Sequence, residues 1–218
     1  MILVAENISK KFESLEVLKG VSLEIQEGEI VSIVGSSGAG KTTLLQILGT
    51  LDKQDSGKVL INNVDTYSLN QNALAKFRNT QLGFIFQFHQ LLPEFTAIEN
   101  AILPALIKGE SIANARERAK ALFDILHISH RLEHKPNELS GGEQQRVSVA
   151  RALMNKPAIV FADEPSGNLD SKNSDELHQL FFDLRDKFKQ TFVIVTHNES
   201  LANMADRKLV MNDGLIIS

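Results

Sequence analysis

The chain alternates between short apolar runs and longer stretches with helical spacing. Four runs have the length of buried strands: EIVSIVG (29–35), LGFIF (82–86), AIVFAD (158–163) and TFVIVT (191–196). Runs that are apolar at nearly every position are typical of parallel strands covered on both faces, whereas half-exposed strands alternate. The pattern predicts an α/β fold with a mainly parallel sheet.

Two further patterns predict helices and an antiparallel start. After Asp170, apolar residues recur on one helical face, at Leu177, Leu180, Phe181, Leu184 and Phe188. Between FIFQ and AIVFAD the spacing is helical throughout, with Ala115, Ala119, Leu122 and Leu126 on one face. The N-terminal segments ILVAENISKKF and EVLKGVSLEIQEG are typical of antiparallel hairpins.

These elements predict one domain over residues 1–218. Residues 1–87 and 156–218 form its α/β core, which includes the N-terminal antiparallel β subdomain. Residues 88–155 form a helical subdomain inserted into that core.

Composition excludes several classes of function. The net charge of −4 gives no field that favours nucleic acid or an anionic membrane surface. The absence of cysteine excludes disulfides, thiolate metal sites and a cysteine nucleophile, and it fits a reducing cytosol. No apolar run approaches the roughly 20 residues of a membrane helix, and MILVAENISKK lacks the features of a signal peptide. We expect no nucleic-acid partner and no membrane insertion.

Two glycines mark the start of a helix in ELSGGEQQRVSVARAL, residues 138–153. Ser140 and Glu143 form a capping box, which requires neither Gly141 nor Gly142. Each glycine costs about 1 kcal/mol relative to alanine within a helix. A helix start without β-carbons lets an anion approach free N–H groups at the positive end of the helix dipole. The stretch therefore predicts a phosphate contact.

The strongest motif is GSSGAGKTT, residues 35–43, which matches G-x-x-x-x-G-K-[ST] between a predicted strand and a predicted helix. Its backbone N–H groups are expected to surround a triphosphate, Lys41 to reach the β and γ phosphates, and Thr42 to bind Mg²⁺. We predict a P-loop nucleotide site at Gly35, Ser36, Ser37, Gly38, Ala39, Gly40, Lys41 and Thr42.

Two carboxylates end the run AIVFADE. Asp163 suits the shell of a magnesium ion, and Glu164 is the candidate general base for water attacking the γ phosphate. The alternative is an ordinary solvated turn, because Asp, Glu and Pro are common in turns. The neighbouring P-loop favours the functional interpretation.

Taken together, the P-loop, the LSGGEQQ signature, IVFADE, Gln87 and His197 resemble the nucleotide-binding subunits of ABC transporters over the whole chain. This resemblance implies a P-loop NTPase core and two subunits packed head to tail around two Mg-ATP. It also implies that the signature helix of one subunit binds the phosphate held by the other. One surface can then supply both halves of a shared site.

The resemblance also assigns site residues. Gln87 is implied as a sensor that contacts Mg²⁺ and the attacking water, and His197 as a γ-phosphate ligand. Thr43 would bind phosphate, and Asp170 would cross the dimer interface. Phe12 stands where the family has an aromatic ring against adenine, usually tyrosine; the alternative is a core phenylalanine.

Within the family, FHQLLPEFTAIEN and DEPSGNLD most resemble the lipoprotein-releasing ATPases, whose relatives serve macrolide exporters and cell-division complexes. The resemblance implies an integral membrane permease as partner and a cytoplasmic, peripheral location on the inner face of the bacterial inner membrane. The related exporter or cell-division ATPases, or a soluble non-transport regulator, are the alternatives.

Other ATP- and GTP-binding classes fit less well. A GTPase requires an N-K-x-D motif, and NKPA at 155–158 lacks the aspartate. A chromosome-organising or DNA-repair ATPase requires a long heptad coiled coil, which the pattern does not contain. Glu164 disfavours a chain that binds ATP only as a structural clamp.

An apolar cluster follows Gln87. Phe88, Leu91, Leu92 and Phe95 surround Pro93 without a helical or strand period. They could belong to the core of the helical lobe. As a group in a loop, they instead predict a docking surface, and the resemblance implies that a short permease helix binds there.

Overall fold

The computed structural model describes residues 1–217 and contains two sheets. The first is antiparallel, with the order β2-β1-β4-β5. Its strands are β1 (Leu3–Phe12), β2 (Leu15–Ile25), β4 (Ser56–Ile61) and β5 (Val64–Asp65). This sheet confirms the predicted antiparallel start.

The second sheet has the order β10-β9-β3-β8-β7-β6 and is parallel from β9 to β6. Strand β10 runs antiparallel to β9. The strands are β3 (Ile30–Val34), β6 (Leu82–Phe86), β7 (Ile159–Asp163), β8 (Thr191–Val195), β9 (Arg207–Asn212) and β10 (Leu215–Ile216). The four strands predicted from apolar runs are β3, β6, β7 and β8, so the mainly parallel α/β fold is confirmed.

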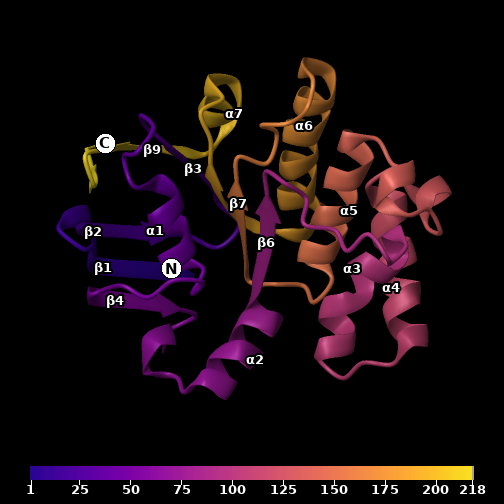
Figure 1. Cartoon of the computed structure of the whole chain (residues 1–218), viewed down its shortest axis with the longest axis horizontal. Helices are drawn as coiled ribbons and strands as arrows, with labels where there is room; N and C mark the ends of the chain where they lie inside the picture. The colour runs from indigo at the N-terminus through magenta and orange to yellow at the C-terminus, as the bar shows by residue number, and fades with distance from the viewer. Residues whose placement is uncertain (218) are drawn as a thin grey trace.

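Seven α-helices accompany these sheets within residues 1–217: α1 (Lys41–Leu48), α2 (Gln71–Gln81), α3 (Ala97–Ile107), α4 (Ile112–Ile125), α5 (Gly141–Leu153), α6 (Ser171–Phe188) and α7 (Glu199–Met204). Figure 1 shows the antiparallel sheet on one side of the parallel sheet, and α3, α4 and α5 on the other. Residues 87–96 are not helical, so the expectation of helical spacing from FIFQ onward was wrong there, and the loop predicted around Pro93 is confirmed.

The predicted apolar face of α6 is correct except at its end. Leu177, Leu180, Phe181 and Leu184 are buried, but Phe188 is 47 % exposed. Phe188 is the last residue of the helix, and Lys189 follows it in the left-handed conformation, with φ of 55°. The chain therefore turns before Phe188 can reach the core.

Two hydrophobic clusters cover the two faces of the parallel sheet. One joins α3, α4, α5 and α6 to Ile30, Val160 and Ala162. The other joins the antiparallel sheet and α1 to Val31 and Phe161. Because helices from residues 97–153 share a cluster with α6 and the sheet, their separation as a subdomain spanning 88–155 remains a prediction.

Candidate functional site

Four parallel strands end at the same edge of the sheet, and each leads into a predicted site residue. Strand β3 leads to Gly35, β6 to Gln87, β7 to Glu164 and β8, through Thr196, to His197. The register pairs Ile33 with Val195, Val195 with Asp163, and Asp163 with Phe86. The carboxyl edge of a parallel sheet is the usual place for ligands in open α/β folds.

The P-loop depends on glycine for close backbone packing. A Cβ on Gly35 would lie 2.0 Å from the Met211 carbonyl oxygen of β9, and one on Gly40 would lie 2.9 Å from the Val17 carbonyl oxygen. Gly40 caps α1 in a left-handed conformation without a side-chain hydrogen bond. The first-turn N–H groups of α1 are therefore available to an anion.

A cavity of about 590 Å³ lies beside this loop. Its lining contains ten predicted site residues: Phe12, Gly35, Ser37, Gly38, Gly40, Lys41, Thr42, Thr43, Glu164 and His197. Leu15, Val17 and Val195 complete it and were not predicted. Ser36 and Ala39 belong to the loop but not to the lining. The volume is typical of small-molecule sites.

Lys41 lies over the loop that precedes it. Its Nζ donates hydrogen bonds to the carbonyl oxygens of Gly35 and Ser36, both at 2.9 Å. The ammonium is thus held at the cavity, where it can meet anionic oxygens.

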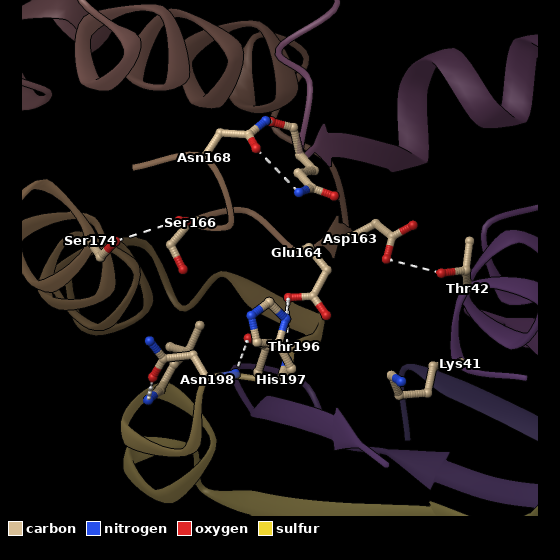
Figure 2. Close-up of polar contacts among 12 residues, drawn as sticks. Lys41, Thr42, Asp163, Glu164, Ser166, Asn168, Ser174, Thr196, His197 and Asn198 are labelled. Carbon is tan, nitrogen blue, oxygen red and sulfur yellow. Dashed lines mark hydrogen bonds and ion pairs between the residues drawn. The ribbon is translucent and has the colours of Figure 1, made fainter. Parts of the chain in front are cut away.

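Thr42 and Asp163 form a pair suited to a magnesium ion (Figure 2). Thr42 Oγ1 donates to Asp163 Oδ1 at 3.3 Å. Burial and the nearby Glu164 raise the pKa of Asp163, against the opposing effects of Thr42 and Lys41. Within residues 1–217 no group of three or more His, Cys, Asp or Glu side chains could hold a metal alone. Magnesium commonly binds one or two carboxylates together with substrate phosphates, so this sparse donor set fits it.

Glu164 has a left-handed backbone, with φ of 46°. Such a conformation is costly for a residue with a side chain and is concentrated at functional sites. Its Oε2 lies 2.8 Å from His197 Nδ1 and accepts a hydrogen bond from the His197 backbone N–H at 3.2 Å. Figure 2 shows the two side chains in contact, and both line the cavity. The structure therefore brings the candidate base and the candidate phosphate ligand together.

Phe12 is at the end of β1 and is 50 % exposed. Lys10 Nζ lies 5.0 Å from its ring centroid. Exposure and a place in the cavity lining contradict the core alternative. They leave the ring face accessible to a flat ligand.

Gln87 lies outside the cavity lining. Its Nε2 donates to Asn168 Oδ1 at 3.3 Å, and Asn168 Nδ2 donates to the Gln87 carbonyl oxygen at 3.0 Å. Asp170 is also outside the lining and caps α6, accepting hydrogen bonds from Asn173 N at 2.9 Å and Asn173 Nδ2 at 2.6 Å. The predicted roles of Gln87 and Asp170 toward a ligand remain predictions.

Ser140 caps α5 with the predicted capping box, in which Glu143 Oε2 accepts from Ser140 N at 2.8 Å. A Cβ on Gly142 would lie 2.8 Å from Asn173 Oδ1, whereas a Cβ on Gly141 would meet nothing closer than 3.6 Å. The contact with Asn173 therefore favours glycine at position 142, whereas no contact among the described residues requires glycine at position 141. Ser140, Gly141 and Gly142 are not among the residues that line the cavity.

Two residues that organise the site surroundings were not found from the sequence. Asn100 is buried, and its Nδ2 donates to the carbonyl oxygens of Leu92 and Phe95, both at 3.1 Å. Arg151 on α5 donates to the carbonyl oxygens of His89 and Gln90, at 2.7 and 2.6 Å. The one available signal was Asn100 itself, a polar position inside the apolar helix AIENAILPALI.

Comparisons with known proteins agree with this geometry. The family model described as ABC transporter matches residues 18–167. The lipoprotein-releasing system ATP-binding protein LolD of Cytophaga hutchinsonii is 60 % identical over 216 residues, which cover 99 % of each chain. A solved dimeric structure of a bacterial ABC transporter cassette is similar with a TM-score of 0.91 at 40 % identity, covering 99 % of this chain and 97 % of that one. A dimeric post-hydrolysis state of the same cassette, bound to ADP and Pi, has a TM-score of 0.90 at 40 % identity, with the same coverage.

Proposed function

Because the chain belongs to the ABC transporter ATP-binding family, we propose that it is the ATPase subunit of a lipoprotein-releasing transporter. It dimerises head to tail around two Mg-ATP and drives a membrane permease. Dimeric cassettes and a post-hydrolysis complex among its relatives support dimerisation and hydrolysis. The name of its 60 % identical relative supports lipoprotein release as the process.

One observation carries this proposal. The P-loop, Glu164 and His197 line one cavity, while Ser140 at the signature helix of the same chain is not part of it. The start of α1, which has no side-chain cap, would bind an anion within the chain, and the glycine-rich start of α5 would bind a second one. A second subunit related by a two-fold axis supplies the missing helix start to each cavity.

The residues of the cavity have separate roles in ATP binding and hydrolysis. Phe12 stacks on the base, the N–H groups of the P-loop and Lys41 hold the phosphates, and Glu164 accepts a proton from the attacking water. His197 hydrogen-bonds the γ phosphate and orients Glu164. Mg²⁺ held by Thr42 and Asp163 would supply charge neutralisation at the phosphates.

Gln87 couples the nucleotide bound in the cavity to the permease. Its Nε2 contact with Asn168 ties it to the loop that follows Glu164, while the amide oxygen is the atom that would bind the magnesium ion and the water. Arg151 donates to the carbonyl oxygens of His89 and Gln90 and so connects the neighbouring segment to α5, the signature helix.

The permease binds the exposed loop after Gln87. Phe88 is 67 % exposed, Leu92 42 % and Phe95 38 %, whereas Leu91 packs on the core. A cavity of about 470 Å³, lined also by Phe86 and Ile107, meets this loop at Gln90. Exposed apolar patches of this kind mark interaction sites.

The location follows from the partner. No helix among residues 1–217 is long and apolar enough to cross a membrane. We assign the subunit to the inner face of the bacterial inner membrane, where binding to the permease holds it.

The test is affinity purification of the chain from its native membrane with Mg-ATP present, followed by identification of the integral membrane protein that accompanies it. A lipoprotein-releasing permease supports the proposal. A macrolide-exporter or cell-division partner would assign the chain to those related complexes, and the absence of any membrane partner would contradict the transport function.

A further inference from the structure

Several basic side chains lie around Glu143, the residue that forms the capping box with the signature serine Ser140. Glu143 Oε2 accepts hydrogen bonds from Ser140 N at 2.8 Å and from Ser140 Oγ at 2.9 Å. The other carboxylate oxygen, Oε1, lies 2.7 Å from Arg131 Nε. Arg131 Nη1 lies 3.2 Å from His134 Nε2, and His130 Nε2 lies 3.5 Å from Glu143 Oε1. Arg131 is the closest positive charge to this carboxylate.

This arrangement presents an electrostatic problem. Burial opposes ionisation of Glu143, but hydrogen bonds from Ser140 and Arg131 outweigh it and bring the pKa to about 2. The carboxylate is therefore charged at neutral pH. A phosphate oxygen that accepts from Ser140 Oγ would lie no more than about 6 Å from Glu143 Oε2, because such hydrogen bonds are about 2.8 Å long. Two anions at that distance repel each other.

We propose that Arg131 is a positioning residue for the shared ATP site: it neutralises Glu143 so that Ser140 can donate to the partner subunit's γ phosphate. The inference rests on the proposed head-to-tail dimer. Ser140 has one hydroxyl proton, and in the structure Glu143 Oε2 accepts it. When the Ser140 hydroxyl donates to a phosphate instead, Glu143 still accepts the hydrogen bond from the Ser140 backbone N–H and still contacts Arg131. Arg131 thus holds the carboxylate, and with it the capping box, in place.

A double-mutant cycle tests this role. Arg131→Gln is expected to raise the KM for ATP hydrolysis about tenfold, while the Kd of the monomer for ATP stays unchanged, since one uncompensated charge near a bound anion has an effect of this order. In a Glu143→Gln background the same substitution is expected to change KM by less than about twofold. Arg116→Gln is the matched control, because Arg116 pairs with Glu133 on the surface of the same helical region.

The outcomes separate a charge effect from a structural one. An equal KM increase in both backgrounds would overturn the proposal, because Arg131 would then act by holding the fold. Arg131→Lys retains the charge and is expected to stay within about threefold of the wild-type KM. A Lys variant whose KM is raised about tenfold over wild type would also overturn it, and this comparison with wild type stands even if the Gln variant is unstable.

Mixing experiments identify the subunit on which Arg131 acts. In a mixture of Arg131→Gln with Lys41→Ala, one of the two sites of a mixed dimer has an intact P-loop and an intact signature helix. Hydrolysis at low ATP is expected to exceed that of either variant alone. No recovery would place the effect of Arg131 in its own P-loop and reject the proposal. If wild-type protein neither dimerises nor hydrolyses ATP, the proposed function itself fails.

Discussion

At the residue scale, Glu164 is the side chain that we propose as the base for hydrolysis. Its left-handed backbone and its contact with His197 hold the carboxylate at the cavity. We expect Glu164→Gln to bind ATP normally and to slow turnover by a factor on the order of 10² or more, because an amide cannot accept the proton from water. ATPase rates and light scattering with Mg-ATP measure this effect, and a nucleotide-bound dimer should accumulate.

The control for this variant is Glu199→Gln, which removes an exposed carboxylate that pairs with Lys208 at 2.7 Å. It should retain the wild-type rate. Near-normal turnover of Glu164→Gln would remove Glu164 from the role of base.

The low pKa of Glu143 predicts a pH-dependent contribution to stability. A carboxylate with a depressed pKa stabilises the folded state above its unfolded value, here 4.5, and loses that contribution as the pH falls toward about 2. The difference in unfolding free energy between wild type and Glu143→Gln should therefore shrink as the pH is lowered from 5 to roughly 3. Denaturant titrations at several pH values measure it, and a constant difference would contradict the assigned cause.

Local motifs made the residues of the cavity predictable from sequence. The P-loop, Asp163 and Glu164 stand at the ends of apolar runs, so the strand ends identify them, whereas His197 was assigned from the family resemblance. Asn100 and Arg131 could not be found in this way, because their roles depend on contacts with Leu92 and Glu143, which no sequence pattern specifies.

At the element scale, the loop from 87 to 96 depends on one buried side chain. Asn100 Oδ1 accepts from Leu92 N at 2.7 Å, and Nδ2 donates to three carbonyl oxygens. Asn100→Leu leaves these groups unpaired and should destabilise the protein by about 2 to 4 kcal/mol. Urea unfolding tests this, with the exposed Asn114→Ala as control; equal stabilities would show that the loop is held by other contacts.

The exposed side chains of this loop give a separate prediction. Leu92→Asp and Phe95→Asp should yield folded proteins with near-normal basal ATPase, because both side chains are exposed. They should no longer co-purify with the permease or be stimulated by it. Leu91→Asp is the contrasting variant, since Leu91 packs on the core and its substitution should lower stability. Variants at 92 and 95 that fold and couple normally would exclude this surface.

Buried strands were easier to predict from the sequence than exposed loops and short strands. Strands β3, β7 and β8 are almost entirely buried and β6 is mostly so, and their runs, apolar at nearly every position, identified them. The loop from 87 to 96 gave two conflicting predictions: the stretch as a whole was expected to be helical, while the apolar residues around Pro93 have no helical period and predicted a loop, which the structure contains. Short strands such as β5, with two residues, carry too little pattern to be recognised.

At the scale of the whole molecule, the shared site predicts complementation between inactive variants. Ser140→Arg should leave ATP binding to the monomer intact, because Ser140 does not line the cavity, whereas Lys41→Ala should weaken binding. Each should be inactive alone. A mixture should recover hydrolysis, since one site of the mixed dimer carries neither change; loss of ATP binding in Ser140→Arg monomers would refute the shared site.

The contact of Lys41 with two carbonyl oxygens sets a minimum negative charge for any ligand oxygen that replaces them. A ligand must offer an oxygen with more negative charge than the carbonyls of Gly35 and Ser36 to draw the ammonium away. ADP and ATP carry such oxygens beyond the α position, whereas adenosine has none and AMP ends before it. The subunit would therefore reject adenosine and AMP, whereas ADP would still compete with ATP for the cavity, so transport would slow as the ratio of ADP to ATP rises.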